Sequence, residues 1–321
     1  MVRTQFTRLR DWQVGDSLVD LIKAICWSGS DGIKSAKLGN PSDIAELALE
    51  LLIALSLRNR DRIGLVWPFI HEYLASCTSQ ESATESSPLV ERSVKGMMKI
   101  CQRLLPYKED TADMLLSSLS LIGEMSPGVV WDLSPAISLE LTVLISQSAP
   151  YIRTENGWRT IAILIRMSAS RPEALPNSLK ALMLACRNPG CITYVSYMPL
   201  LETILQLIDD FKEKSPSTAS EFLDCADSLF SWLPKQSSSA DTSKLSNASI
   251  LDLWLTSVSI LAKGLCREQS QSLRDTSMAS LHQTLLASNS LDLSPDIWTQ
   301  AIKELILPLV SGTCMSCQPE Q

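Results

Sequence analysis

The chain of 321 residues contains two histidines, the residue type that most often acts as a general acid or base. His71 and His282 lie far apart in sequence, and neither sits at a spacing that binds a metal ion. His71 follows Trp67 by four positions in an amphipathic pattern, so it shares a helix face with an aromatic anchor. Both histidines are interpreted as packing or surface residues rather than as catalytic groups.

A second candidate for chemistry is the C-x-x-C pair Cys314 and Cys317, which has the spacing of a zinc or redox motif. A structural zinc ion needs four ligands, and no second pair lies nearby in sequence. Thioredoxin-like chemistry needs the motif at a helix start in a βαβ unit, whereas this pair lies in a polar terminal tail. The pair is interpreted as incidental thiols. The nine cysteines together predict small buried hydrophobes rather than disulfides.

Glycines and tryptophans offer two further possibilities, a phosphate loop and a ligand cage. Gly29, Gly32 and Gly39 lack a Lys-Ser or Lys-Thr partner and a preceding strand, so they indicate a loosely structured N-terminal segment instead. Tryptophans are more often the core anchors of helix pairs than a cage. This interpretation covers Trp67, Trp158, Trp254 and Trp298. No catalytic, cofactor-binding or metal-binding residue is predicted, and no cofactor.

Composition and charge restrict the class of partner. The net charge of −7 and the isoelectric point of about 5.0 argue against nucleic acid, because that affinity comes mainly from Lys and Arg on phosphates. A bare anionic membrane is disfavoured for the same reason. The N-terminus lacks the apolar stretch of a secretory signal. The chain contains no run of about 18 uncharged apolar residues, so no transmembrane segment is predicted. The sequence therefore predicts a cytoplasmic protein.

Apolar residues recur at helical spacing along most of the chain. Asn40 and Pro41 can start a helix that carries Ile44, Leu51 and Leu55 on one face. A polar turn at 58–61 separates it from the next helix. Ser87 with Pro88 starts another, which Pro106 with Tyr107 ends. Further expected helices include 158–167, 175–186, 250–266, 272–287 and 295–310, with Ser-rich loops at 76–87 and 234–247.

Helix pairs that recur about every 40 residues are typical of HEAT and armadillo arrays. The predicted fold is all-α, an α-solenoid of HEAT/armadillo-like helical hairpins whose stacked surface binds other proteins. The expected organisation is a loosely structured segment with one short helix at 1–39, a first half of the repeat region at 40–187, a second half at 188–312 and a polar tail at 313–321. The boundary at 187 rests on the break signal of residues 187–190.

Three strings are more specific than helix chemistry demands: NRDRI at 59–63, ICQRLLPYKE at 100–109 and GWRTI at 157–161. With their neighbours they resemble the large Arf guanine-nucleotide exchange factors of the GNOM and Golgi type, in the helical-repeat region downstream of the catalytic exchange domain. Weaker likeness extends through 253–286 and 294–307. Nothing in the chain resembles the exchange domain itself, so no catalytic glutamate can be carried over.

The resemblance implies a non-catalytic regulatory and targeting region of an Arf exchange factor in Golgi or endosomal vesicle transport. It also implies Arf-pathway or membrane-protein partners and a peripheral place on Golgi or endosomal membranes. A stand-alone solenoid adaptor unrelated to nucleotide exchange is the alternative, and an enzyme built on the C-x-x-C tail is a third. Arg103, Lys108 and Arg159 could contact a partner, but a solvated helix face explains them equally well. Ile44, Leu51 and Leu55 are expected to be only partly covered at the N-terminal end of the array.

Overall fold

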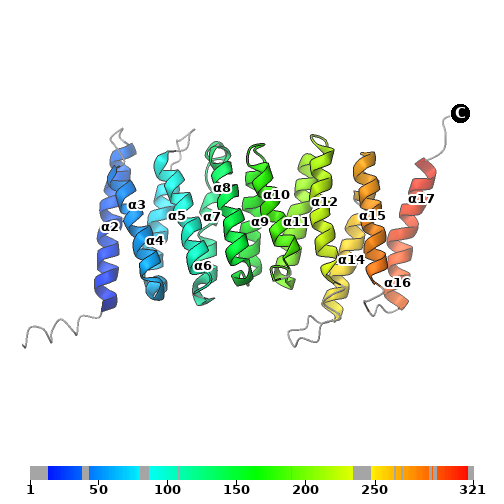
Figure 1. Ribbon diagram of the computed structural model, residues 1–321, viewed down its shortest axis with the longest axis horizontal. Helices are drawn as coiled ribbons and strands as arrows, with labels where there is room; N and C mark the ends of the chain where they lie inside the picture. The colour runs from blue at the N-terminus through cyan, green and yellow to red at the C-terminus, as the bar shows by residue number, and fades with distance from the viewer. Residues whose placement is uncertain are drawn as a thin grey trace, which may run out of the picture. The chain divides into compact units, whose positions relative to one another are not determined.

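The structure is a computed structural model, and every regular element in its described part is helical. It describes residues 14–37, 43–79, 87–107, 109–188, 190–233, 247–263, 265–268, 270–288, 291 and 295–316. The chain divides into two compact units, Met1–Leu184 and Ala185–Gln321. The division falls inside helix α10, Leu175–Arg187, close to the expected boundary after residue 187. Figure 1 shows the elements in chain order.

The first unit consists of helices and short 3-10 turns. Its elements are α2 Val14–Lys37, α3 Asp43–Arg58, η1 Arg60–Arg62, α4 Ile63–Thr78, α5 Pro88–Leu104, η2 Glu109–Thr111, α6 Ala112–Ser117, α7 Ser120–Gly123, α8 Pro127–Ser148, η3 Ala149–Tyr151 and α9 Glu155–Ala169, followed by α10. The polar turn predicted at 58–61 is confirmed as η1 and its flanks. Asn40, Pro41 and most of the predicted loop at 76–87 lie outside the described residues.

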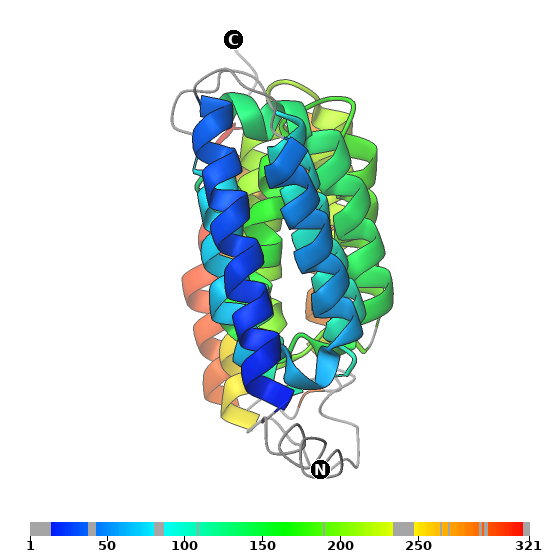
Figure 2. The same ribbon diagram turned by 90° about the vertical axis from the view of Figure 1, so that its left-hand side faces the viewer.

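The helices of this unit lie in two rows. Helix α3 packs on α5 and α5 packs on α8, while α4 contacts α7, and α6 and α7 both contact α9. Helix α2 packs on α3 and α4, and it stands beside α3 at the same end of the unit (Figure 2). Between the rows lie fully buried side chains from both, among them Leu52, Trp67, Met97, Leu141 and Trp158. Burial of such large apolar groups contributes roughly 2–3 kcal/mol each, so the rows are held by their shared core.

Local capping defines several helix ends. Ser87 accepts a hydrogen bond from the Val90 amide, and Pro88 occupies the first turn of α5, as the sequence predicts. The helix ends at Leu104, before the predicted stop at Pro106. Pro135 lies inside α8, whose first residue is Pro127. A proline is tolerated there because the surrounding helix is fixed by its packing on α5 and α9.

The expected loose segment with one short helix at 1–39 is wrong, because α2 is a continuous helix of 24 residues. Its two described glycines lie where α2 touches its neighbours. A Cβ atom on Gly29 would lie 2.5 Å from the Tyr73 hydroxyl, and one on Gly32 would lie 2.8 Å from the Ala45 backbone nitrogen. The glycines therefore allow close helix packing rather than breaking the helix. Gly39 lies outside the described residues.

The second unit begins within α10. Its elements are α11 Tyr194–Phe211, α12 Pro216–Phe230, α14 Asn247–Lys263, η4 Leu265–Arg267, α15 Gln271–Ala287, α16 Pro295–Ala301, a π-helical turn Ile302–Ile306 and α17 Leu307–Ser316. Helix α11 packs on α12, α12 on α15 and α15 on α14. The buried hydroxyls of Tyr197 and Ser257 lie 2.7 Å apart and join α11 to α14.

The expected polar tail at 313–321 is also partly wrong, since α17 continues to Ser316. Residues 317–321 and most of the loop predicted at 234–247 lie outside the described residues.

One helix is long and apolar enough to cross a membrane by length and composition, although Asp132 and Glu140 leave no run of about 18 uncharged apolar residues in it. The segment Pro127–Tyr151 passes by length and composition, and 56% of its most apolar window is buried inside the protein. Helix α8 packs on α5 and α9 along this stretch. Its hydropathy is that of a helix buried in the core of the first unit.

Candidate functional site

The two histidines lie on helices of different units. His71 is half-buried on α4 of the first unit, and His282 is exposed on α15 of the second. Among the described residues, no group of three His, Cys, Asp or Glu side chains could hold a metal ion. The backbone of Cys314 lies in α17, while Cys317 lies outside the described residues.

The described cysteines carry free thiols, most of them buried. Burial raises the pKa of Cys101 and of Cys225 to about 12. The same desolvation raises the pKa of Cys77 to about 11, against which hydrogen bonds from Ser93 and Tyr73 act. A thiol held protonated at neutral pH is a poor nucleophile and a poor metal ligand. These cysteines are small core residues, as the sequence indicates.

Of the four tryptophans named as core anchors, three lie in the core and Trp298 is only partly covered. Trp67, Trp158 and Trp254 are fully buried, and the Trp298 ring lies against Trp254 at 5.6 Å between centroids. Trp27 and Trp131 do not fit the interpretation of the tryptophans as core anchors, since they are 72% and 47% exposed.

A groove on the outer side of the row α3, α5 and α8 is the best-defined surface feature of the first unit. It encloses about 690 Å³. Helix α3 supplies Glu50, Ile53, Ala54 and Leu57, helix α5 supplies Arg92, Lys95, Gly96, Lys99, Gln102 and Arg103, and helix α8 supplies Glu140. The floor is apolar and the rims are charged.

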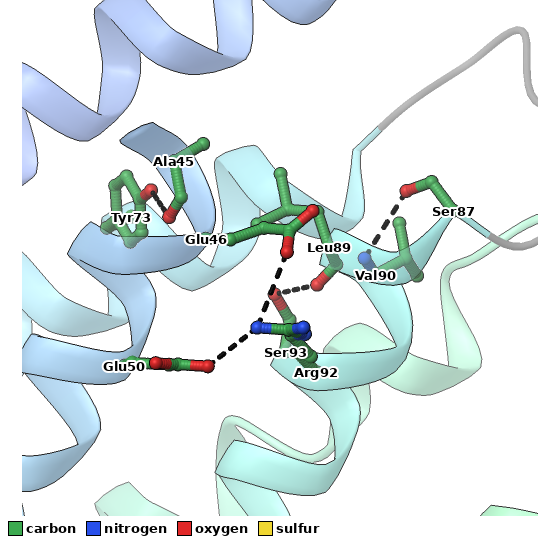
Figure 3. A network of polar contacts seen from close by, with 9 residues as sticks. All are labelled: Ala45, Glu46, Glu50, Tyr73, Ser87, Leu89, Val90, Arg92 and Ser93. Carbon is green, nitrogen blue, oxygen red and sulfur yellow. Dashed lines mark hydrogen bonds and ion pairs between the residues drawn. The ribbon is translucent and has the colours of Figure 1, made fainter. Parts of the chain in front are cut away.

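Close approach of α3 and α5 forms the floor. A Cβ atom on Gly96 would lie 2.4 Å from Ile53 Cδ1, so a larger residue there would displace the Ile53 side chain from the backbone of α5. At one end the Arg92 guanidinium pairs with Glu50 at 2.6 Å and Glu46 at 3.4 Å, which ties α5 to α3 (Figure 3). At the α8 side, the Gln102 amide donates to the Glu140 carboxylate at 2.7 Å.

Four cations follow one face of α5 through the groove. Arg92, Lys95, Lys99 and Arg103 stand at spacings of three and four, which places them in one stripe. Arg92 is engaged as described, and Lys95 pairs with Glu91 at 2.5 Å. Lys99 and Arg103 are exposed and make no ion pair within the described part of the chain. Lys99 and Arg103 therefore place two positive charges without an ion pair, among the described residues, beside the apolar floor of the groove.

The three family-like strings meet at one edge of the first unit. The Arg60 guanidinium lies over the Tyr107 ring at 4.3 Å from its centroid, which joins the first string to the second. Glu109 forms an ion pair with Arg153, just before the third string. Within that string the Trp158 indole donates to the Ile152 carbonyl at 2.9 Å. These contacts lock helix ends together.

Other polar residues in or beside the strings make local contacts. The Asn59 amide donates to the Leu55 carbonyl at the end of α3. The Thr154 hydroxyl caps α9 through the Gly157 amide and donates to Asp113 at 2.6 Å. Arg159 pairs with Glu155 at 2.7 Å on its own helix. Of the three cations considered from the sequence, Arg103 alone lies in the groove, and Lys108 lies outside the described residues.

The chain is homologous, at about 30% identity over most of its length, to a segment of the large Arf guanine-nucleotide exchange factors. ARF guanine-nucleotide exchange factor GNOM of Arabidopsis thaliana is 31% identical over 302 residues, which cover 92% of this chain and 20% of GNOM. The resemblance found in the three strings is thereby confirmed.

Two further relatives extend the match. ARF guanine-nucleotide exchange factor GNL1 of Arabidopsis thaliana is 30% identical over 272 residues, 82% of this chain and 18% of GNL1. The Golgi-specific brefeldin A-resistance guanine nucleotide exchange factor 1 homolog of Caenorhabditis elegans is 27% identical over 162 residues, 48% of this chain and 8% of that protein. The chain therefore spans about a fifth of the length of GNOM and of GNL1. No family model matches the chain, and no solved structure gives a significant match.

Sequence reasoning missed the groove, although part of its signal was readable. The three-four spacing of Arg92, Lys95, Lys99 and Arg103 places them on one side of a helix. The apolar floor was not readable, because it depends on how closely α3 approaches Gly96.

Proposed function

We propose that this chain is a non-catalytic regulatory and targeting region of an Arf guanine-nucleotide exchange factor in Golgi or endosomal vesicle transport. The observation that carries the proposal is the alignment with GNOM over 92% of the chain. The aligned portion is 20% of GNOM, which leaves the rest of such a protein to hold the exchange activity. The name of the Caenorhabditis elegans relative supports a place on the Golgi.

The proposed architecture is an α-solenoid. In the first unit, α3, α5 and α8 form one row and α4, α6, α7 and α9 form the other, as successive hairpins of a HEAT-like array would. Such arrays bind other proteins through their long open surfaces. The proposed partners are proteins of the Arf pathway or of Golgi and endosomal membranes. Nucleic acid is not a proposed partner, because the net charge is −7. The proposed location is the cytoplasm, with peripheral membrane association.

A segment exchange tests the targeting role. In GNOM, the region aligned with this chain is deleted, or replaced by this chain, or replaced by an unrelated helical array of equal length. The fraction of GNOM on Golgi and endosomal membranes is then measured by fractionation and imaging. We expect deletion and the unrelated array to lower that fraction, and this chain to restore it. Recovery no better than with the unrelated array, or no effect of deletion, overturns the proposal.

The non-catalytic part is tested with purified components. The chain is mixed with Arf loaded with a fluorescent GDP analogue, and nucleotide release is followed over time, with an isolated exchange domain as the positive control. We expect release at the rate of Arf alone. Acceleration by the chain would contradict a non-catalytic role.

A further inference from the structure

The groove on α3, α5 and α8 has the chemistry of a docking site for a peptide. Its floor is made by Ile53, Ala54 and Leu57 of α3, with Ile53 resting on the buried backbone of α5 at Gly96. Ile53 and Leu57 are only partly covered by the protein itself. An apolar surface of this kind is suited to one or two apolar side chains of a partner, which gain free energy when they leave water.

The charge of the groove selects the partner. Four cationic and two anionic side chains line it, in a protein whose net charge is −7. Both anions are already satisfied, Glu50 by Arg92 and Glu140 by the Gln102 amide. Lys99 and Arg103 remain without an ion pair among the described residues. Since Glu46 and Glu91 pair with Arg92 and Lys95, the positive charge available to a partner is that of Lys99 and Arg103, on the stretch of α5 that borders the apolar floor.

Geometry favours a short segment over a folded domain. The stripe from Arg92 to Arg103 follows roughly three turns of α5, a length of about 16 Å. A partner helix lying along it would place apolar side chains at spacings of three and four on the floor and acidic ones over the stripe. A bare anionic membrane fits less well, because Glu50 and Glu140 flank the groove and the whole chain is acidic.

We propose that this groove binds an acidic amphipathic segment of a partner protein, with its carboxylates on Lys99 and Arg103 and its apolar side on Ile53, Ala54 and Leu57. The inference rests on the proposed role of the chain as a protein-binding region, and it specifies the surface and the partner chemistry. The carboxylates would gain charge-assisted hydrogen bonds from the two unused cations. Charge complementarity of this kind sets specificity and association rate.

Peptide selection on the full chain tests the proposal. A random library of displayed 16-residue peptides is selected on the chain and counter-selected on the double variant Lys99→Glu with Arg103→Glu. We expect recovered peptides to be rich in Asp and Glu, with apolar residues at spacings of three and four. Their affinity is then measured for each single charge reversal and for Leu57→Asn.

The matched control is Lys180→Glu, which reverses an exposed α10 cation that likewise makes no ion pair in the described part of the chain. We expect about tenfold weaker binding for Lys99→Glu and for Arg103→Glu, or about 1.4 kcal/mol each, and no change for Lys180→Glu. Recovery of no acidic peptides, or equal loss with Lys180→Glu, overturns the proposal. Phosphatidylserine vesicles are a parallel probe. Binding of vesicles but not peptides, lost in the double variant, would assign the groove to lipid and also overturn it.

Failure of this inference and failure of the proposed function are distinguishable. The selection uses this chain alone, whereas the segment exchange measures membrane association of GNOM. A chain that restores targeting but selects no acidic peptide retains the exchange-factor assignment and loses only the groove.

Discussion

Replacing Gly32 with alanine tests the packing of α2 on α3. The sequence patterns predict a loosely structured segment around Gly32, whereas this residue lies at the contact between the two helices. In an exposed helix this change stabilises, because alanine exceeds glycine in helix propensity by about 1 kcal/mol. Here the new Cβ would lie 2.8 Å from the Ala45 backbone nitrogen and 3.3 Å from its Cα. A backbone atom cannot rotate away, so α2 must move. Overpacking costs about 1–3 kcal/mol, and we expect a net loss of about 1–2 kcal/mol.

The control is Gly64→Ala, near the start of α4. Its Cβ would meet Thr111 Cγ2 at 3.5 Å, which is ordinary contact. The free energy of unfolding should therefore rise by up to about 1 kcal/mol. Thermal and urea unfolding are followed by circular dichroism, where 1 kcal/mol corresponds to about 2–4 °C in a unit of this size. Hydrogen exchange then locates the change, with faster exchange expected in α2 for Gly32→Ala. Equal stabilisation by both substitutions would refute the close packing of α2 on α3.

Three further predictions concern burial elsewhere. Burial raises the pKa of Asp227, whose Oδ1 lacks a partner among the described residues while Oδ2 accepts from Ser280. The ionised carboxylate then destabilises the fold above its folded pKa, and Asp227→Asn should stabilise by under about 1 kcal/mol at pH 7 in urea titrations. That gain should shrink as pH falls toward the ordinary carboxyl pKa, and a pH-independent gain would contradict the cause. Leu47 and Leu51 are 58% and 44% exposed on one face of α3, so their joint change to Gln should lower aggregation in light scattering with little effect on Tm. Unchanged aggregation would show that another surface drives association. Cys101 should resist iodoacetamide at pH 8 in the native protein and react in urea, as peptide mass spectrometry can measure, because burial raises its pKa to about 12. Rapid native labelling would contradict its burial.

Local sequence chemistry predicted much of the helical pattern. The Ser87–Pro88 start and the stop before Pro106 follow from capping and from the missing proline amide, and the structure has both. The helix expected at 175–186 is Leu175–Arg187. The expected partial exposure at the N-terminal end is confirmed for Ile44 and Leu51, which are 59% and 44% exposed. Leu55 is likewise only partly covered.

The wrong prediction for the N-terminal segment and the missed groove share one physical origin, because both depend on contacts between residues distant in sequence. Gly29 and Gly32 have low helix propensity, but contacts with Tyr73 and Ala45 decide their structure. The groove also depends on such a contact, between Ile53 and Gly96. A basic stripe on α5 could be read from spacing alone, whereas the apolar floor beside it required the packed helices. Sequence patterns predict a helix and its faces, and they do not specify which face stays uncovered.

The central claim is that the chain is a non-catalytic region of a large Arf exchange factor. Long-read sequencing of transcripts across the codon for Met1 tests it most directly. The account predicts an in-frame exchange domain upstream in the same transcript. Mature transcripts with translation starting at Met1 and no exchange domain would contradict the claim and favour a stand-alone helical adaptor.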